Sequence, residues 1–208
     1  GLHTLGRGSI RDTLLEIKFV DHEGRLVKAG GPTVKNVSGF DLCRLFVGSY
    51  GVLGFAHEFV LRTRPLPVAQ RWFTTEVPTA DELREIQVAF FRPSSLLWNG
   101  ERAWICLAGH PQDIDEQIAA DRRVWIDADG PPNLDGLHRR RVAPESLPVV
   151  VSASAGRAVG EVGVGIVHHP EPNGEPMADP GRRAVVQRVL GAFNPLDRLN
   201  PQIDRDQL

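Results

Sequence analysis

Residues 35–54 read KNVSGFDLCRLFVGSYGVLG and place four glycines around one short apolar run. Glycine adopts positive φ angles readily and lets the backbone approach a neighbouring group closely. Asp41 is a suitable N-cap for a helix over 42–47, and Gly48 falls where a left-handed residue ends such a helix. The spacing by itself leaves open whether the glycines serve packing within the chain or contact with a ligand.

The segments on either side of this motif alternate between apolar and polar residues, as half-buried strands do. Residues 13–20 and 25–29 predict two strands joined by a turn. Residues 51–62 predict a long third strand with one apolar face. The prolines of PLP at 65–67 cannot continue a central strand, so we place the end of a first domain, residues 1–68, at this point.

Residues 69–208 show a different order of elements and are predicted to form a second domain. The pattern gives a strand at 71–77, a helix at 80–91, a hairpin turning at Asn99–Gly100 and a helix opening at Pro111. This strand–helix–strand–strand–helix order is typical of a ferredoxin-like layer of helices on one face of an antiparallel sheet. The predicted fold class of the whole chain is therefore α+β.

The rest of the second domain has weaker patterns. We expect a loop over 127–148, because this stretch is rich in proline, glycine and arginine. Apolar runs predict strands over 147–154 and 159–169. A last helix is predicted to begin at Asp179–Pro180.

Composition and charge exclude several classes of function. The chain has 208 residues, a formal net charge of −2 and two cysteines, so it has no bulk attraction for nucleic acid. Its basic cluster, Arg139–Arg141, is interpreted as a solvated loop or as a contact for an anion or a subunit. Cys43 and Cys106 form no metal-spaced or redox pair, which favours small buried side chains in a reducing cytoplasm. We expect neither a transmembrane segment nor a leader.

The complete motif is more specific than its glycine spacing. The pattern GG-x-x-x-KNVSGFDL-x-x-LFVGS-x-G-x-LG, followed by a strand and RPLP, resembles the FAD-linked oxidases of the vanillyl-alcohol oxidase type, which carry a PCMH-type FAD-binding domain. GRGSIRDTLLEIKFV at 6–20 and FNPLDRLNP at 193–201 are similar to other segments of these enzymes. Within that group the chain is most similar to the FAD-binding subunits of glycolate oxidases. The resemblance is dense over 1–68 and thin over 69–190.

This resemblance implies a role for each domain. Residues 1–68 would be the C-terminal half of the FAD-binding domain, and residues 69–208 the cap domain with a tail that returns to the FAD domain. In the family, backbone at the matching positions lies against FAD, where side chains would collide with it. The implied cofactor-binding residues are Gly6, Gly8, Ser9, Asp12, Gly51, Gly54 and Phe55. Lys35, Asn36 and Asp41 also match the motif, Asp41 as a helix cap and Asn36 as a turn residue.

Two departures from the family pattern affect the expected function. The glycine-rich loop that holds the FAD diphosphate would precede Gly1, so we expect this chain alone to bind FAD weakly or not at all. Either the chain is a fragment or the other half of the domain comes from elsewhere. Related 2-hydroxy-acid dehydrogenases carry H-x-G-D-G-N-x-H, where this chain has EVGVGIVH at 161–168. Alternation along one strand would put Glu161 and His168 on opposite faces, so no metal site is predicted. The family's Glu-His-Gly segment has no counterpart either.

The implied reaction is the oxidation of a 2-hydroxy acid with electron transfer through flavin. Such a reaction needs a base for the hydroxyl proton and a cation for the substrate carboxylate. The catalytic residues are unknown from the sequence, with His168 and His169 as candidates for the base. Candidates for the cation are Arg92 and Arg139–Arg141.

We therefore predict an FAD-dependent oxidoreductase component, the FAD-binding subunit of a glycolate oxidase-like complex. Its implied partners are a catalytic flavoprotein subunit and an iron–sulfur subunit, in the cytoplasm or at the membrane through those partners. The alternatives are a self-sufficient flavin oxidase of another alcohol or hydroxy acid, and a flavin-free scaffold. Turnover without partner subunits would separate the first two, and an absence of flavin in the complete parent chain would identify the third.

Overall fold

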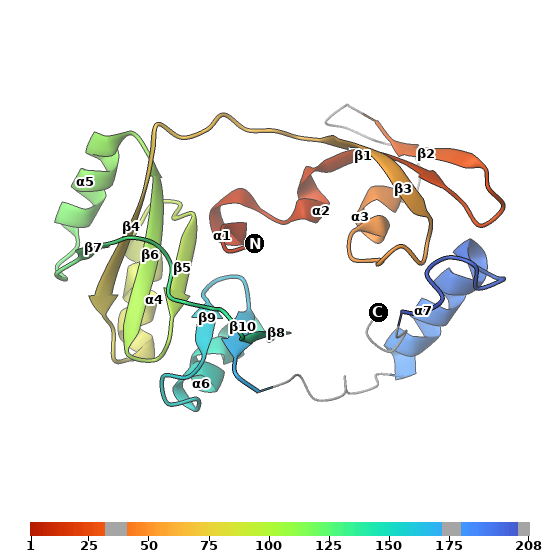
Figure 1. Ribbon diagram of the computed structural model, residues 1–208. Helices are drawn as coiled ribbons and strands as arrows, with labels where there is room; N and C mark the ends of the chain where they lie inside the picture. Colours follow the sequence, from red (N-terminus) through yellow and green to blue (C-terminus); the bar gives the residue numbers. More distant parts are fainter. Residues whose placement is uncertain (32–40, 172–179, 204–208) are drawn as a thin grey trace. The chain divides into compact units, whose positions relative to one another are not determined.

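The computed structural model describes residues 1–31, 41–171 and 180–203 (Figure 1). Contacts within the chain divide it into two compact units. Unit 1 consists of Gly1–Gly8 and Pro65–Gly174, and unit 2 consists of Ser9–Arg64 and Glu175–Leu208. Each unit is therefore assembled from two stretches that are far apart in the sequence.

Unit 1 is built on a seven-stranded sheet with the order β7-β4-β6-β5-β9-β10-β8, in which all neighbouring strands are antiparallel. The strands are β4 (Ala69–Glu76), β5 (Ser95–Trp98), β6 (Arg102–Gly109), β7 (Ile126–Ala128), β8 (His138–Arg141), β9 (Val159–Glu161) and β10 (Ile166–His169). The chain order β4-α4-β5-β6-α5-β7, paired as β7-β4-β6-β5, is the ferredoxin-like arrangement. The predicted α+β class and ferredoxin-like layer are confirmed, and three further strands extend the sheet.

Three helices pack into the core on one face of this sheet. They are α4 (Ala80–Ala89), α5 (Pro111–Ala120) and α6 (Leu147–Ser152), the last preceded by a 3₁₀ turn at Pro144–Ser146. Helix α4 begins where the hydroxyl of Thr79 accepts a hydrogen bond from the Glu82 amide at 3.2 Å. Leu83 and Ile86 of this helix are fully buried in one apolar cluster with Ile105 of the sheet. The three-residue spacing of these apolar positions thus fixes which side of α4 faces the sheet.

The first residues of the chain belong to unit 1, where α1 (Thr4–Arg7) contacts β5. Nδ1 of His3 lies 2.8 Å from Oγ of Ser95, and the Gly6 amide donates to the Ser94 carbonyl at 3.2 Å. Burial lowers the pKa of His3, and the charges of Arg7 and of the terminal amine lower it further. The imidazole therefore docks in its neutral form.

Unit 2 contains a three-stranded antiparallel sheet with the order β2-β1-β3. Its elements are α2 (Ile10–Thr13), β1 (Leu14–Val20), β2 (Leu26–Gly30), α3 (Leu42–Phe46), β3 (Phe55–Leu61) and α7 (Pro180–Phe193). Ile17 and Phe19 of β1 are buried against Phe46 of α3 and Leu190 of α7. The predicted cap of α3 is confirmed, because Oδ1 of Asp41 accepts from the Arg44 amide at 3.1 Å.

Three expectations for the end of unit 1 are wrong. Residues 147–152 form helix α6 and not a strand, because Leu147 and Val151, four residues apart, are both buried in the core. The expected loop over 127–148 contains β8, which pairs with β10 along its length. The expected strand over 159–169 is a hairpin of β9 and β10, because Gly163 and Gly165 adopt φ angles of 77° and 76° between them.

The contact boundary between the units falls at Arg64/Pro65, four residues before the predicted domain boundary. Residues 1–8 group with the ferredoxin-like unit, whereas α7 and the tail group with the first sheet. The assignment of residues 1–68 to half of an FAD domain and of 69–208 to a cap remains a prediction. Asp179, the expected start of the last helix, lies outside the described residues.

Candidate functional site

A groove of about 770 Å³ runs along unit 2, lined by β1, β3, α3, the loop 47–54 and the tail. Its wall on β3 is apolar, and the side chain of Phe55 is 67% exposed there, with Phe59 and Leu61 also exposed. Residues of this kind are expected to bury their surface when a partner is present. These three side chains lie on the predicted apolar face of β3, and among the described residues nothing covers them.

The loop at the end of the groove has an unusual backbone. Gly48, Tyr50 and Gly51 all adopt positive φ angles, of 86°, 51° and 80°. Tyr50 is a non-glycine residue in the left-handed region, a conformation that the surroundings must stabilise. The amide of Asn200 in the tail donates to the Tyr50 carbonyl at 2.6 Å, so the tail holds this loop. The 193–201 tail thus belongs to the unit that contains the first sheet, and its return to an FAD domain stays a prediction.

The tail itself is fixed by one side chain. Asn194 accepts hydrogen bonds from the amides of Arg198 and Leu199, at 2.9 and 3.2 Å, and donates to the Leu199 carbonyl at 2.9 Å. Asn194 is buried. Its side-chain amide supplies hydrogen-bond partners for backbone groups of the turn after α7 that have no partner in a helix or strand. This turn directs Asn200 toward the loop 47–54.

The structure brings some of the implied cofactor residues together and separates others. Gly51, Gly54 and Phe55 all line the groove of unit 2. Ser9 and Asp12 lie at the start of α2 in the same unit, bonded to each other at 2.8 Å. Gly6 and Gly8 belong to unit 1. Lys35 and Asn36 lie outside the described residues.

Two of these glycines are required by the chain itself. A Cβ atom at Gly54 would lie 2.5 Å from Cδ2 of Phe19, and one at Gly6 would lie 2.7 Å from Cα of Ser94. Both distances are far below a normal contact. Packing within the chain is therefore a sufficient reason for glycine at these two positions, and their contact with a cofactor stays a prediction. A Cβ at Gly51 would meet only Cβ of Asn200, at 4.0 Å, so that glycine is explained by its positive φ.

Asp12 is the centre of a small polar cluster. The hydrogen bond from Ser9 lowers the pKa of Asp12, and the charge of Arg44 lowers it further. Nη2 of Arg44 lies 2.9 Å from Asp12 and its Nε lies 3.2 Å from Asp41. These contacts tie α2 to α3, which is a structural role for Asp12 beside the implied cofactor role.

A second cluster lies in unit 1 on the β9–β10 hairpin. Nε2 of His168 is 2.8 Å from Oε1 of Glu161, and the two side chains are 11% and 2% exposed. The expectation that they face opposite sides of one strand is wrong, because the chain reverses at Gly163 and Gly165. Those two glycines, in the sequence VGVG at 162–165, are the signal that could have indicated the hairpin.

Other candidate residues surround this pair. Nη2 of Arg139 on β8 lies 3.7 Å from Oε1 of Glu161, and the ring of His169 is 6.4 Å from that of His138. Within the described stretches, no group of three or more His, Cys, Asp or Glu side chains is placed to hold a metal ion. The hairpin therefore offers a carboxylate–imidazole pair beside a basic edge strand.

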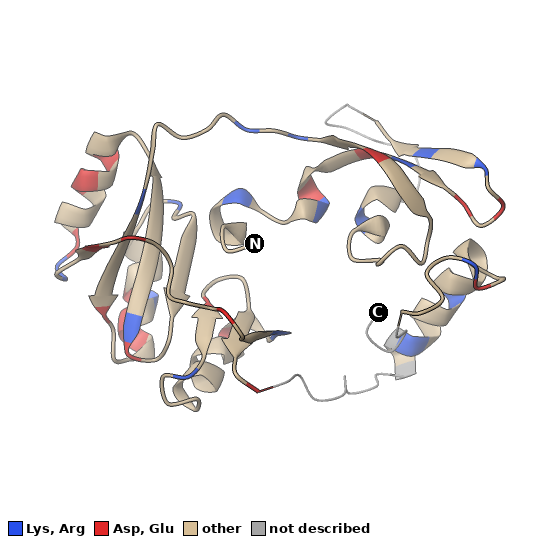
Figure 2. Ribbon diagram, in the orientation of Figure 1, with Lys and Arg blue, Asp and Glu red and all other residues tan. Residues whose placement is uncertain are grey.

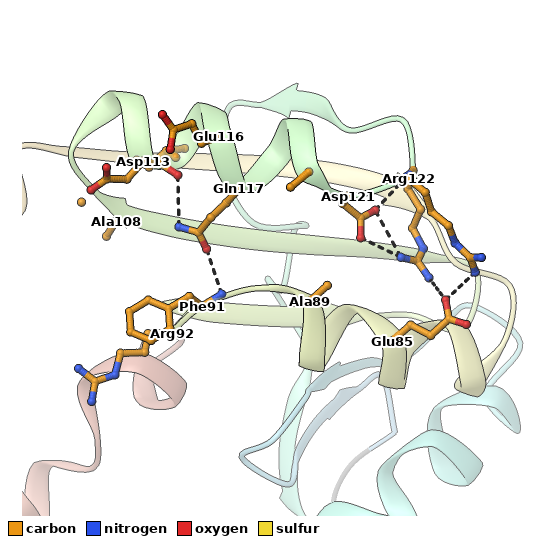
Figure 3. Close-up of a pocket in the computed structure, with 14 residues that line it drawn as sticks. Glu85, Ala89, Phe91, Arg92, Ala108, Asp113, Glu116, Gln117, Asp121 and Arg122 are labelled. Atoms are coloured by element: carbon orange, nitrogen blue, oxygen red, sulfur yellow. Dashed lines mark hydrogen bonds and ion pairs between the residues drawn. The ribbon is translucent and has the colours of Figure 1, made fainter.

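Another groove, of about 910 Å³, lies between α4 and α5 in unit 1 (Figure 3). The Gln117 side chain bridges it, accepting from the Phe91 amide at 3.0 Å and donating to the Asp113 carbonyl. Arg92, a candidate cation, has a φ of 49° and lies 5.5 Å from the Phe91 ring centre. Acidic residues mark α5 in Figure 2, and Glu85 of α4 pairs with Arg122 at 2.6 Å.

Comparison with curated proteins gives several relatives, although no family model matches the chain. Glycolate oxidase subunit GlcE of Escherichia coli is 35% identical over 105 residues, which are 49% of this chain and 30% of that protein. Glycolate oxidase subunit GlcD of Bacillus subtilis is 38% identical over 135 residues, 63% of this chain and 28% of that protein. Over these residues the chain is similar to subunits of glycolate oxidases.

Other curated proteins that this chain matches are dehydrogenases. D-lactate dehydrogenase of Archaeoglobus fulgidus is 28% identical over 137 residues, 64% of this chain and 29% of that protein. The chain spans less than a third of the length of these curated relatives. The matched residues therefore correspond to only one part of these longer relatives.

Solved structures share the fold of this chain. Two crystal forms of alkyldihydroxyacetonephosphate synthase match with TM-scores of 0.61 and 0.62, at 14% and 12% identity. They cover 97% and 98% of this chain, and 54% and 56% of the synthase chains. At this identity the match concerns the fold alone. No helix in the described residues has the length and apolar character needed to span a bilayer.

Proposed function

We propose that this chain is the FAD-binding part of an oxidoreductase that oxidises a 2-hydroxy acid, in a glycolate oxidase-like complex. The observation that carries the proposal is the exposed apolar wall of β3 beside the left-handed loop 47–54, in a chain whose relatives are glycolate oxidase subunits and D-lactate dehydrogenase. An open groove with an aromatic wall suits a flat ring system better than it suits water.

The groove is better suited to a ring of FAD than to its diphosphate. Phe55, Phe59 and Leu61 offer an apolar surface for a ring, and the backbone at Gly51 is open to close approach. Of the residues that line the groove, Arg198 is the one cation, whereas a diphosphate is normally held by several backbone amides or basic side chains. We propose that residues beyond this chain hold the diphosphate. Bound FAD would supply the acceptor for a hydride.

The remaining implied residues take proposed roles around this groove. Gly51, Gly54 and Phe55 would form the ring end of the cofactor site, and Ser9 with Asp12 would approach it from α2. Gly6 and Gly8 belong to unit 1, and their role as cofactor contacts stays a prediction from the sequence motif. The partners that we propose are a catalytic flavoprotein subunit and an iron–sulfur subunit, and the location is the cytoplasm or a membrane surface reached through those partners.

The test is a titration of the full-length protein that carries this chain with FAD, followed by visible flavin absorbance. Phe55→Asp places a charge on an exposed wall residue, so we expect at least about a tenfold loss of FAD affinity, equivalent to about 1.4 kcal/mol. The matched control is Phe91→Asp, because Phe91 is 73% exposed in the other unit and is expected to leave FAD affinity unchanged.

Two results would contradict the proposal at different points. Equal FAD affinity in both variants would remove the groove from the cofactor site. Absence of bound flavin in the wild-type protein would exclude the enzyme and favour the flavin-free scaffold. With flavin bound, anaerobic addition of glycolate or D-lactate should bleach its absorbance, and bleaching without partner subunits would favour the self-sufficient oxidase.

A further inference from the structure

The groove between α4 and α5 of unit 1 has two ends that differ in their charges (Figure 3). At one end, Oε2 of Glu85 lies 2.6 Å from Nη2 of Arg122 and 2.5 Å from Nη2 of Arg123. Oδ2 of Asp121 lies 3.0 Å from Nη1 of Arg123. These four charged side chains compensate one another within the unit, so this end offers little charge to a partner.

The other end carries charges that the unit does not compensate. Arg92 lies on one wall after α4, and Asp113 and Glu116 lie on the facing wall in α5 (Figure 3). Among the described residues these three side chains take part in no ion pair. Arg92 lies 5.5 Å from the ring centre of Phe91, and Glu116 accepts a hydrogen bond from the neutral amide of Gln112 at 3.0 Å. Opposite charges therefore face each other across the groove with neither one neutralised.

Apolar surface is exposed beside these charges. The side chain of Phe91 is 73% exposed, and that of Val88, three residues earlier, is 87% exposed. The small side chains of Ala89 and Ala120 line the groove and leave its volume of about 910 Å³ open. Exposed aromatic surface next to an open groove is typical of a surface that binds another protein.

The wall that carries Phe91 and Arg92 is held in place by α5. The side chain of Gln117 accepts from the Phe91 amide at 3.0 Å and donates to the Asp113 carbonyl at 3.4 Å. Arg92 has a φ of 49° and precedes Pro93, a conformation that is unfavourable for a non-glycine residue and for a residue before proline. Because this wall is already fixed within the unit, a partner that binds it loses little conformational entropy there.

We propose that this groove is an interface between two copies of the chain, related by a two-fold axis. In a two-fold interface the same patch serves on both copies, so the patch must be complementary to itself. The groove meets this requirement, because Arg92 of each copy can face Asp113 and Glu116 of the other. Phe91 of each copy can enter the groove of the other. A partner of one charge sign, such as a nucleic acid or a polybasic segment, would instead meet a like charge on one wall.

The first test counts the copies of the chain in each particle by native mass spectrometry of the full-length protein with any accompanying subunits. We expect two copies in the wild type at micromolar concentration. Phe91→Asp should raise the dissociation constant of the dimer, measured by sedimentation velocity, at least about 30-fold, because aromatic residues buried in an interface dominate its affinity. The matched control is Val149→Asp, since Val149 is 72% exposed on α6 of the same unit and does not line the groove. It should leave the dissociation constant unchanged.

Two charge reversals test the two-fold arrangement. Arg92→Glu or Glu116→Arg alone places like charges opposite each other at both equivalent contacts, and each should raise the dissociation constant at least about tenfold. An equal mixture of the two variants should form a heterodimer with nearly wild-type affinity, because one contact keeps its charges and the other has them exchanged. Nitrogen-15 labelling of one variant gives this heterodimer an intermediate mass. Unchanged tryptophan fluorescence in urea would show that unit 1 is folded in each variant.

Three results would overturn the inference. One copy per particle in the wild type would exclude a second copy as the occupant of the groove. Two copies that persist in Phe91→Asp would place the interface elsewhere. Dissociation of both charge variants without recovery in the mixture would refute the contact between Arg92 and Glu116, and with it the two-fold arrangement. None of these measurements depends on bound flavin, so they test this inference separately from the proposed function.

Discussion

Replacing Gly54 with alanine tests whether the glycine motif serves the packing of the chain or a ligand. The added Cβ would lie 2.5 Å from Cδ2 of Phe19 and 3.2 Å from Cε1 of Phe46. It would also lie 3.2 Å from the carbonyl oxygen of Val20. Because ordinary contacts begin at 3.4 Å, the shortest of these distances is too short by about 1 Å.

The surrounding rings have little room to adjust. Phe19 and Phe46 are both buried, and their ring centres are 4.3 Å apart, so a shift of one ring must displace the other. Overpacking of this kind typically costs about 1–3 kcal/mol. We expect Gly54→Ala to destabilise unit 2 by about 2 kcal/mol, a fall of roughly 30-fold in its folded-to-unfolded ratio, without any flavin present.

The assay must report on unit 2 separately. All four tryptophans, Trp72, Trp98, Trp104 and Trp125, lie in unit 1, so tryptophan fluorescence in urea follows that unit and should be unchanged. Hydrogen exchange of the β1 amides follows unit 2 and should become faster by the same factor. The control is Gly191→Ala in α7 of unit 2, where nothing lies within 4 Å of the added Cβ and helix propensity predicts a gain of up to about 1 kcal/mol.

One result would refute this reasoning. If Gly54→Ala exchanges as slowly as Gly191→Ala in the absence of flavin and yet loses FAD affinity, the glycine serves the ligand and not the aromatic core. Loss of both stability and affinity would agree with packing as the primary cause.

Three further outcomes follow from buried polar groups in unit 1. The pKa of His3 is lowered below 6.5, so docking of residues 1–8 is fully stabilised above that pH and weakens as the pH falls through 6.5. Proton NMR and limited proteolysis would detect the change. Equal docking at pH 5 and pH 8 would contradict this prediction. Burial raises the pKa of Cys106 to about 11, so a thiol reagent at pH 8 should label it only after unfolding, and rapid labelling of the native protein would be inconsistent. Trp98→Phe removes a buried 2.8 Å hydrogen bond to the Val77 carbonyl. It should lower the free energy of urea unfolding of unit 1 by about 1–3 kcal/mol. A loss of stability below about 0.5 kcal/mol would indicate that water replaces the indole as the donor.

Much of the fold followed from periodicity and turn chemistry. Helix α4 was predicted because its apolar residues repeat at helical spacing, and the β5–β6 hairpin because Asn99–Gly100 is a strong turn signal. Helix α6 was missed because three consecutive valines favour a strand, while its true position depends on packing against Gly160 of β9. Local propensity contains no information about such a distant partner.

Less of the candidate site could be predicted from the sequence. The motif identified Gly51, Gly54 and Phe55, which the structure places along one groove. The contact between Glu161 and His168 was missed because residues 159–169 were interpreted as one strand. An apolar pattern also cannot show whether a face is covered, and Phe59 on the predicted apolar face of β3 is exposed.

The division of unit 2 between two distant stretches has a consequence for synthesis on the ribosome. Phe19 and Phe46 are made early, but Leu190, which completes their cluster, emerges only after the whole of Pro65–Gly174. At roughly 5–20 residues per second this interval is on the order of ten seconds. During that time β4–β10 can fold as a continuous block, while the aromatic residues of the first sheet stay accessible to chaperones. Unit 2 therefore completes its native core later than β4–β10 of unit 1.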